Sequence, residues 1–136
     1  MVTEDDPVEE LSTEECWALL ARGELGRIAY LLVDEVHLVP VNYVVDDGCL
    51  LVRTSPGNRL LAAALEAGVA FEIDGRDGGI AWSVVARGRL RRLEEDEQHR
   101  MDDHPEQPWV AVSRPEVVEL RPAVLTGRRF LLREGV

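Results

Sequence analysis

The segment Thr54-Ser55-Pro56-Gly57-Asn58-Arg59 gathers the residue types that bind a phosphate group. It supplies two hydroxyls, a glycine, a capping amide and a guanidinium where a helix is predicted to begin. Free backbone N–H groups and the positive end of the helix dipole meet at such a place. The guanidinium of Arg59 adds two charge-assisted hydrogen bonds to phosphate oxygens. The residues therefore predict a site for a phosphorylated ligand, and the alternative is an ordinary capped helix with a surface arginine.

Other residues in the chain carry weaker signals of chemistry. A group of titratable side chains near the C-terminal third would suggest a metal site: His99, Asp102, Asp103 and His104. The two histidines are five residues apart, which does not align them on one helical face, so we expect no metal site. The sequence contains no Gly-x-Ser-x-Gly, Walker or Rossmann signature, and no side chain stands out as a general acid or base. We therefore identify no catalytic residue.

Composition and charge limit the class of protein. The chain has 136 residues and a net charge of −11, which argues against a nucleic-acid partner. No apolar run is long enough to cross a membrane, and the acidic first residues do not resemble a signal peptide, so we expect a cytoplasmic protein. Cys16 and Cys49 are far apart in the sequence, and we expect both to be free thiols that pack in the interior.

The elements that must position the phosphate loop can be predicted from the pattern of apolar residues. Residues 1–10 are acidic, and we expect a disordered arm. Ser12 and Glu15 form a capping box, which predicts a helix over residues 13–22 that Gly23 ends. Strands are then expected at 27–33, 36–45 and 49–54, with a hairpin turn at Asp46-Asp47-Gly48. A helix at 58–67 follows the phosphate loop.

The remaining elements complete a sheet. A strand is expected at 69–74, a flexible loop at 75–79, and a long strand at 80–93 with a bulge or bend at Gly88. An acidic helix at 94–103 follows, and two last strands at 117–120 and 125–132 are separated by Arg121-Pro122-Ala123. Six to seven antiparallel strands with two to three short helices indicate a mainly β protein, a small closed barrel. Residues 11–136 are expected to form this single domain.

Four segments of this chain, in order, resemble the pyridoxamine 5'-phosphate oxidase-like family of FMN-binding split β-barrels, and most closely its short single-domain bacterial branch. These segments are LSTEECWALLARGELGRIAY, VPVNYVVDDGCLLVRTSPGNRL, AFEIDGRDGGIAWSVVARGRL and VVELRPAVLTGRR. The resemblance covers residues 11–132. It implies a split barrel that forms a homodimer, with a flavin site in each of the two grooves between the subunits.

The resemblance also implies which residues contact FMN. The strand Pro40–Tyr43, which includes Val41 and Asn42, would run beside the isoalloxazine ring. The phosphate would be held by residues at the strand end and the helix start: Arg53, Thr54, Ser55, Asn58 and Arg59. Trp82 and Ser83 would be later flavin contacts, supplied to the site by the partner chain. From the residues alone, Trp82 is equally well a core aromatic, and either Asn42 or Tyr43 faces the core.

The sequence departs from the family pattern at two places. Oxidases of this family carry two adjacent bases in the phosphate loop, whereas Leu60 follows Arg59 here, so we expect a weaker grip on phosphate. The C-terminal segment that holds substrate in true pyridoxamine-phosphate oxidases is not matched. We therefore expect an FMN-dependent oxidoreductase of another small molecule.

Three alternatives keep the fold and change the function. The ligand could be the deazaflavin F420, although its polyglutamate tail favours a more basic groove than this chain offers. It could be haem, for which His37 is the one axial candidate in the predicted core. A third possibility is a dimeric interaction module that has lost the cofactor, which the single base at Arg59 makes credible.

Overall fold

The computed structural model describes residues 1–54, 65, 67–102, 104 and 116–133. These residues form a mainly β protein whose seven antiparallel strands make one sheet in the order β1-β7-β4-β3-β2-β5-β6. An additional pairing of β7 with β6 closes the sheet into a barrel, as the sequence predicts. No helix in the described part of the chain is long and apolar enough to cross a membrane.

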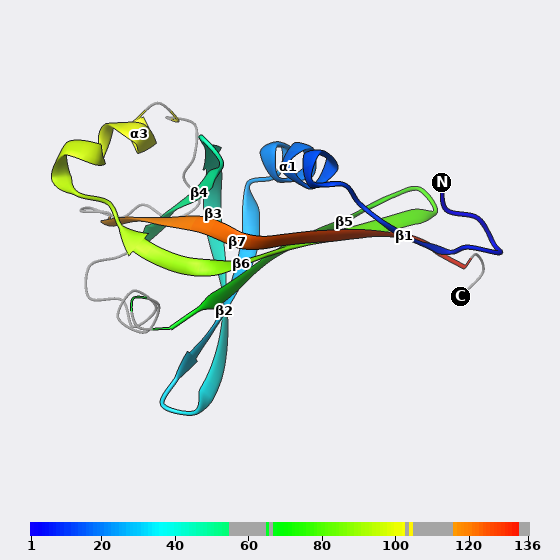
Figure 1. Ribbon diagram of the computed structural model, residues 1–136, viewed down its shortest axis with the longest axis horizontal. Helices are drawn as coiled ribbons and strands as arrows, with labels where there is room; N and C mark the ends of the chain where they lie inside the picture. Colours follow the sequence, from blue (N-terminus) through cyan, green and yellow to red (C-terminus); the bar gives the residue numbers. More distant parts are fainter. Residues whose placement is uncertain (55–64, 66, 103, 105–115, 134–136) are drawn as a thin grey trace.

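The elements follow one another along the chain with short connections (Figure 1). The strands are β1 (Val8–Glu10), β2 (Leu25–Leu32), β3 (Glu35–Asp46), β4 (Cys49–Thr54), β5 (Val69–Asp77), β6 (Ile80–Arg92) and β7 (Glu116–Leu131). The helices are α1 (Thr13–Arg22), the short 3-10 helix η1 (Glu95–Glu97) and α3 (His99–Asp102). The predicted helix at 58–67 lies mostly outside the described residues.

Helix α1 begins and ends as its sequence predicts. The Ser12 hydroxyl accepts from the Glu15 N–H at 3.1 Å, and the Glu15 carboxylate accepts from the Ser12 N–H at 3.0 Å. Gly23 is the residue at its C-terminal end. Cys16 and Leu20 of α1 are fully buried, and the helix packs close to β7, where a Cβ on Gly127 would overlap the Cys16 sulfur. Glycine at position 127 therefore lets the helix lie against the sheet.

The barrel interior is filled by apolar side chains that alternate along the strands. Ile28, Tyr43, Val52, Phe71 and Val84 are almost fully buried and belong to one cluster with the inner face of α1. A second, smaller cluster lies on the other side of β4. It consists of Leu51, Leu93, Met101 and Val117. Strand β4 is thus buried on both faces, which accounts for its apolar sequence from Cys49 to Val52.

Two tight turns match the predicted hairpins. Asp47 and Gly48 connect β3 to β4 with positive φ angles of 48° and 74°. Val33 and Asp34 connect β2 to β3 with φ angles of 48° and 61°, so β2 ends one residue before the predicted end at residue 33. Positive φ at both central residues is typical of turns whose twist matches that of the flanking strands.

Four expectations from the sequence need correction. Val8–Glu10, expected to be disordered, form β1 and pair with Arg128–Phe130 of β7. Strand β5 continues through Asp77, so the loop expected at 75–79 shrinks to a turn at Gly78-Gly79. The acidic helix expected at 94–103 is two short pieces, η1 and α3.

The fourth correction concerns β7, which is one strand of 16 residues where two were expected. Proline interrupts a strand because it cannot donate a hydrogen bond to the ladder. Here Pro122 lies opposite Gly88, at the point where the β6–β7 register shifts. A bulge tolerates a missing donor, so the strand continues through Pro122. The bulge predicted at Gly88 is confirmed.

Candidate functional site

Strands β3 and β4 separate immediately before the predicted phosphate loop. Their pairing runs from Asp46–Cys49 to Tyr43–Val52. From Asn42 back to Glu35, β3 pairs with β2, beginning at the pair Asn42–Leu25. Strand β4 instead continues beside β7 to the pair Thr54–Glu116. Figure 1 shows the β2–β3 hairpin projecting away from β4. We call this opening the fork, and Asn42 and Arg53 lie on its two sides.

The fork brings three of the predicted site residues together, Asn42, Tyr43 and Arg53. Asn42 and Arg53 line one small hollow, with Leu51 and Met101 in its wall. The Asn42 amide donates to the Glu24 carbonyl at 3.2 Å, which leaves its own oxygen as an acceptor. Arg53 is half-buried on the same face of β4 as Leu51. The fork therefore offers an amide and a guanidinium at the start of the loop that follows Thr54.

Other predicted residues near the fork have different surroundings. Pro40 is exposed and Val41 half-buried on the part of β3 that pairs with β2. Thr54 is 4% exposed, with its hydroxyl 3.5 Å from the Glu116 carbonyl, so it faces the sheet interior. Ser55, Asn58 and Arg59 lie outside the described residues.

Tyr43 faces the core, which settles the alternation between Asn42 and Tyr43. Its ring is 1% exposed and makes an edge contact with Phe71 at a centroid distance of 4.9 Å. Its hydroxyl donates to the Leu20 carbonyl at 2.6 Å, at the end of α1. Burial raises the pKa of Tyr43 to about 12, so the hydroxyl stays protonated. The Tyr43 hydroxyl thus joins α1 to the barrel, although Tyr43 is also among the residues that line the fork hollow.

Trp82 and Ser83 lie on a different surface, on strand β6. Trp82 is half-buried, and a Cβ on the paired residue Gly75 would overlap its indole ring. Both residues line a groove of about 400 Å³, together with Arg76 and Phe130. Trp82 packs against the core cluster, which agrees with its interpretation as a core aromatic, and its role as a flavin contact stays a prediction.

A second groove runs along β6 and β7, next to the groove that contains Trp82. Its volume is about 540 Å³, and Ser83 and Phe130 line it as well. Four polar residues join them: Glu10 of β1, Arg87 of β6, and Thr126 and Arg128 of β7. We call this the β6–β7 groove, and its lining includes neither Asn42 nor Arg53. Sequence reasoning missed its arginines, although their alternation with buried residues such as Val84 and Ala86 marks an outward face.

Helix α3 closes the fork hollow on one side, and a group of charges holds it there. Arg100 donates to Asp46 at 2.9 Å and to Glu119 at 2.6 Å, while Arg91 donates to Glu97 at 2.7 Å. Burial alone raises the pKa of Glu119, but the hydrogen bond and charge of Arg100 lower it overall. Met101, the next residue, is thereby fixed beside Leu51 and the hollow.

The histidines are spread over separate places. His99 lies with Nδ1 at 3.0 Å from the Asp96 carbonyl, and His104 lies 3.5 Å from Asp46. His37, the axial candidate for haem, stacks on Tyr30 at a centroid distance of 5.1 Å on the β2–β3 hairpin. It is half-buried on that hairpin and packs against Tyr30, a member of the core cluster.

Known proteins resemble this chain over most of its length. An uncharacterised Mycobacterium tuberculosis protein, Rv0080, is 31% identical over 131 residues, which cover 91% of this chain and 86% of the relative. A structure of the FAD binding protein from Mycobacterium smegmatis is 36% identical, with a TM-score of 0.79 over 90% of this chain and 99% of that protein. A structure of a FAD and haem binding protein from the same organism shares the fold, with a TM-score of 0.73 at 17% identity over 93% of this chain and 74% of that one.

The match to a family model covers nearly all the structural elements described above. It spans residues 12–129, from the cap of α1 almost to the end of β7, and that family is described as pyridoxamine 5'-phosphate oxidase. The mainly β fold is consistent with the split barrel of this family. This chain belongs to the pyridoxamine 5'-phosphate oxidase family.

Proposed function

We propose that this protein binds a flavin nucleotide, FMN, and uses it as an oxidoreductase of a small molecule. In this proposal the backbone of Pro40–Asn42 lies beside the ring, and Arg53, Ser55, Asn58 and Arg59 hold the phosphate. The similarity to a FAD binding protein at 36% identity supports a flavin as the ligand class. FMN is the part that the two flavin nucleotides have in common.

The observation that carries the proposal is the fork. Up to Asn42 strand β3 pairs with β2, and no described strand pairs with the side that faced β4, so backbone groups there can meet a ligand. Arg53 lies across the opening and leads directly into the phosphate loop. A guanidinium for a phosphate, and an amide and backbone groups for a polar ring edge, are the donors and acceptors that a flavin nucleotide requires.

The two groups of predicted contacts suggest that two chains build one site. Trp82 and Ser83 line grooves that do not include Asn42 or Arg53. We propose a homodimer in which one protomer contributes the fork and its partner contributes the surface around Trp82. On that surface Ser83 lies on the same outward face of the sheet as Phe130.

The side chains have binding roles in this proposal. A bound flavin supplies hydride transfer, and the protein supplies binding, orientation and electrostatics. Arg53 and Arg59 neutralise the phosphate, and Met101, held by the charges around Arg100, limits the hollow on one side. The substrate is then selected by the shape of the groove beside the ring, which suits a small molecule.

Replacement of Arg59 tests the phosphate loop directly. We expect Arg59→Ala to weaken FMN binding by about 1.5–3 kcal/mol, as for a lost hydrogen bond between charged groups. The dissociation constant is measured by quenching of flavin fluorescence during titration. Arg22→Ala is the matched control, because Arg22 is an exposed arginine in the last turn of α1. An Arg59→Ala protein that binds FMN as tightly as the control would refute the role of this loop.

A further inference from the structure

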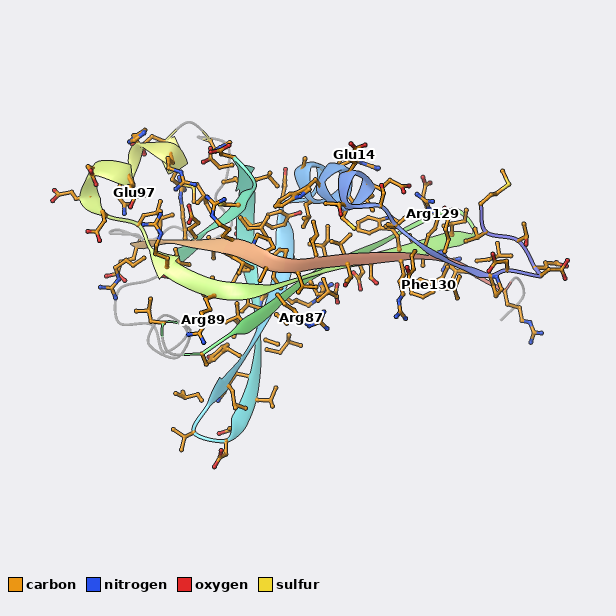
Figure 2. All side chains as sticks on the ribbon, in the orientation of Figure 1. Glu14, Arg87, Arg89, Glu97, Arg129 and Phe130 are labelled. Atoms are coloured by element: carbon orange, nitrogen blue, oxygen red, sulfur yellow. The ribbon has the colours of Figure 1, made fainter. Side chains whose placement is uncertain are left out.

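The β6–β7 groove lies on the outward face of the sheet and carries positive charge. Arg87 and Arg128 line it from neighbouring strands, Ser83 and Thr126 add hydroxyls, and Phe130 adds a ring. Figure 2 shows Arg87 and Phe130 on the side of the sheet opposite α1. The volume of about 540 Å³ is in the range of sites for small molecules.

The two groove arginines have no acidic partner. Within the described ranges, neither Arg87 nor Arg128 forms an ion pair. The acidic residues that share this face on the next strand, Glu72 and Asp74 of β5, are both paired with Arg27. Their charges are therefore balanced without the groove arginines.

Glu10 is the one carboxylate among the described residues that line the groove. It lies opposite Arg128 in the β1–β7 register. Two guanidiniums thus stand against one carboxylate, on a chain whose net charge is −11. Positive charge that is concentrated in a groove and is not balanced by the protein itself favours an anionic ligand.

Arg128 lies beside the surface that is proposed to contact the flavin ring. It is opposite Ser83 in the β6–β7 register, and Ser83 also lines the groove that contains Trp82. In the proposed dimer, the fork of one protomer holds the phosphate of FMN, and the surface around Ser83 comes from the other protomer. The β6–β7 groove therefore opens at the ring end of the flavin. A substrate must lie at this end, because hydride transfer requires contact with the ring.

Arg87 lies at the far end of the groove from the ring. It is four residues beyond Ser83 on β6, a distance of about 14 Å at the rise of a β-strand. Val85 and Thr126, which are paired across the two strands, line the groove between them. A molecule that begins at the ring and extends along the groove therefore meets Arg128 first and Arg87 last.

We propose that the β6–β7 groove binds the substrate of the flavin, and that this substrate is a small organic anion. Arg128 holds its carboxylate or phosphate group, and Arg87 adds a second positive charge farther along. Phe130, which lines both grooves, contacts the apolar part of the molecule. This inference rests on the proposed flavin site and names the class of molecule on which it acts.

The test measures the binding of benzoate and phenyl phosphate to the full-length protein by calorimetry. The protein is first saturated with FMN, so that the phosphate loop is not open to phenyl phosphate. We expect Arg128→Ala to lower the affinity of the anion about tenfold or more, and Arg87→Ala to lower it by a smaller factor. Glu10→Gln should raise it, because the substitution removes the negative charge from the groove. FMN affinity should stay unchanged, and Arg22→Ala is the control for the loss of one positive charge.

The absorption spectrum of the bound flavin shows whether the anion lies beside the ring. We expect benzoate or phenyl phosphate to shift the visible bands in the wild-type protein and in Arg22→Ala, and the same concentration to shift them far less in Arg128→Ala. Tighter binding of phenyl phosphate would assign a phosphate ester as the substrate, and tighter binding of benzoate a carboxylate. Anion binding that depends on Arg128 but leaves the spectrum unchanged would overturn the role as a substrate site.

Other results would overturn the groove assignment itself. These are failure of both anions to bind, equal affinity in the wild-type protein and Arg128→Ala, or benzyl alcohol binding as tightly as benzoate. Failure of FMN to bind would refute the flavin site and, with it, the substrate role. Titration of the FMN-free wild-type and Arg128→Ala proteins with benzoate would then decide separately whether the groove binds an anion.

Discussion

Burial gives Tyr43 and Asn42, neighbours on one strand, different roles. Tyr43 is buried with its hydroxyl bonded to the last turn of α1, and Asn42 faces the fork. Alternation along β3 predicts that the two residues face opposite sides, but it does not say which side is the core. The decision depends on α1, whose C-terminal carbonyl offers the partner that a buried phenol requires.

We predict that Tyr43→Phe lowers stability and leaves flavin affinity unchanged. The substitution removes the hydroxyl and leaves the buried Leu20 carbonyl without this donor, at a cost of about 1–2 kcal/mol. The free energy of unfolding is measured by urea denaturation, and affinity by flavin fluorescence. A stable variant that loses flavin affinity would mean that the phenol acts at the ligand site.

The face of β4 on which Arg53 lies could not be predicted from the sequence. The run Cys49–Thr54 predicts a strand with its bounds, and the structure confirms them. It does not predict where Arg53 points, because a strand that is apolar at every earlier position gives no sign of which face is buried. Both faces of β4 are covered, one by the barrel interior and one by α3.

Short elements are positioned by charge rather than by their own propensity. Helix α3 has only four residues, too few for a stable isolated helix, and its place depends on Arg100 and its carboxylate partners. The run of acidic residues at 94–103 predicts one helix, because such a run is typical of the exposed face of a helix. It could not reveal that Glu119, far along the chain, would pair with Arg100.

The pairing of Glu119 predicts a dependence of stability on pH. Its pKa is lowered in the folded protein, so its contribution is present above the ordinary value of 4.5 and is lost as the pH falls through the folded value. We expect Glu119→Gln to cost about 1–3 kcal/mol near neutral pH, since it leaves two arginines short of a partner. The difference from the wild-type protein should shrink at acid pH. Urea denaturation at several pH values measures it, and a difference that does not vary with pH would contradict the role of the ion pairs.

At the scale of the whole molecule, the barrel leaves one outward face of the sheet rich in apolar side chains. Leu31, Val36 and Leu38 on the β2–β3 hairpin are 50%, 73% and 65% exposed. A groove of about 540 Å³ beside the hairpin is lined by Leu31, Val36, Ala70 and Val124. Large exposed apolar patches are typical of protein–protein interfaces. The sequence predicts the hairpin, but which strands close the barrel and which face stays open depends on pairings distant in the chain, such as β6 with β7.

We predict that this face forms the proposed homodimer and that Leu38→Glu disrupts it. A charge placed in an apolar interface costs several kcal/mol when it is buried without a partner. Light scattering of the variant should give the mass of a monomer, and its flavin affinity should fall, because each site is proposed to need both chains. A circular dichroism spectrum like that of the wild-type protein would show that the fold is intact. A Leu38→Glu protein that remains a dimer would place the interface elsewhere.

The central claim is that this split barrel holds a flavin nucleotide, and the most direct measurement is the visible absorption spectrum of the purified protein after incubation with FMN, FAD or F420 and gel filtration. We predict flavin bands that elute with the protein after incubation with FMN. A colourless protein fraction after each incubation, or a chromophore retained only with F420, would contradict the claim.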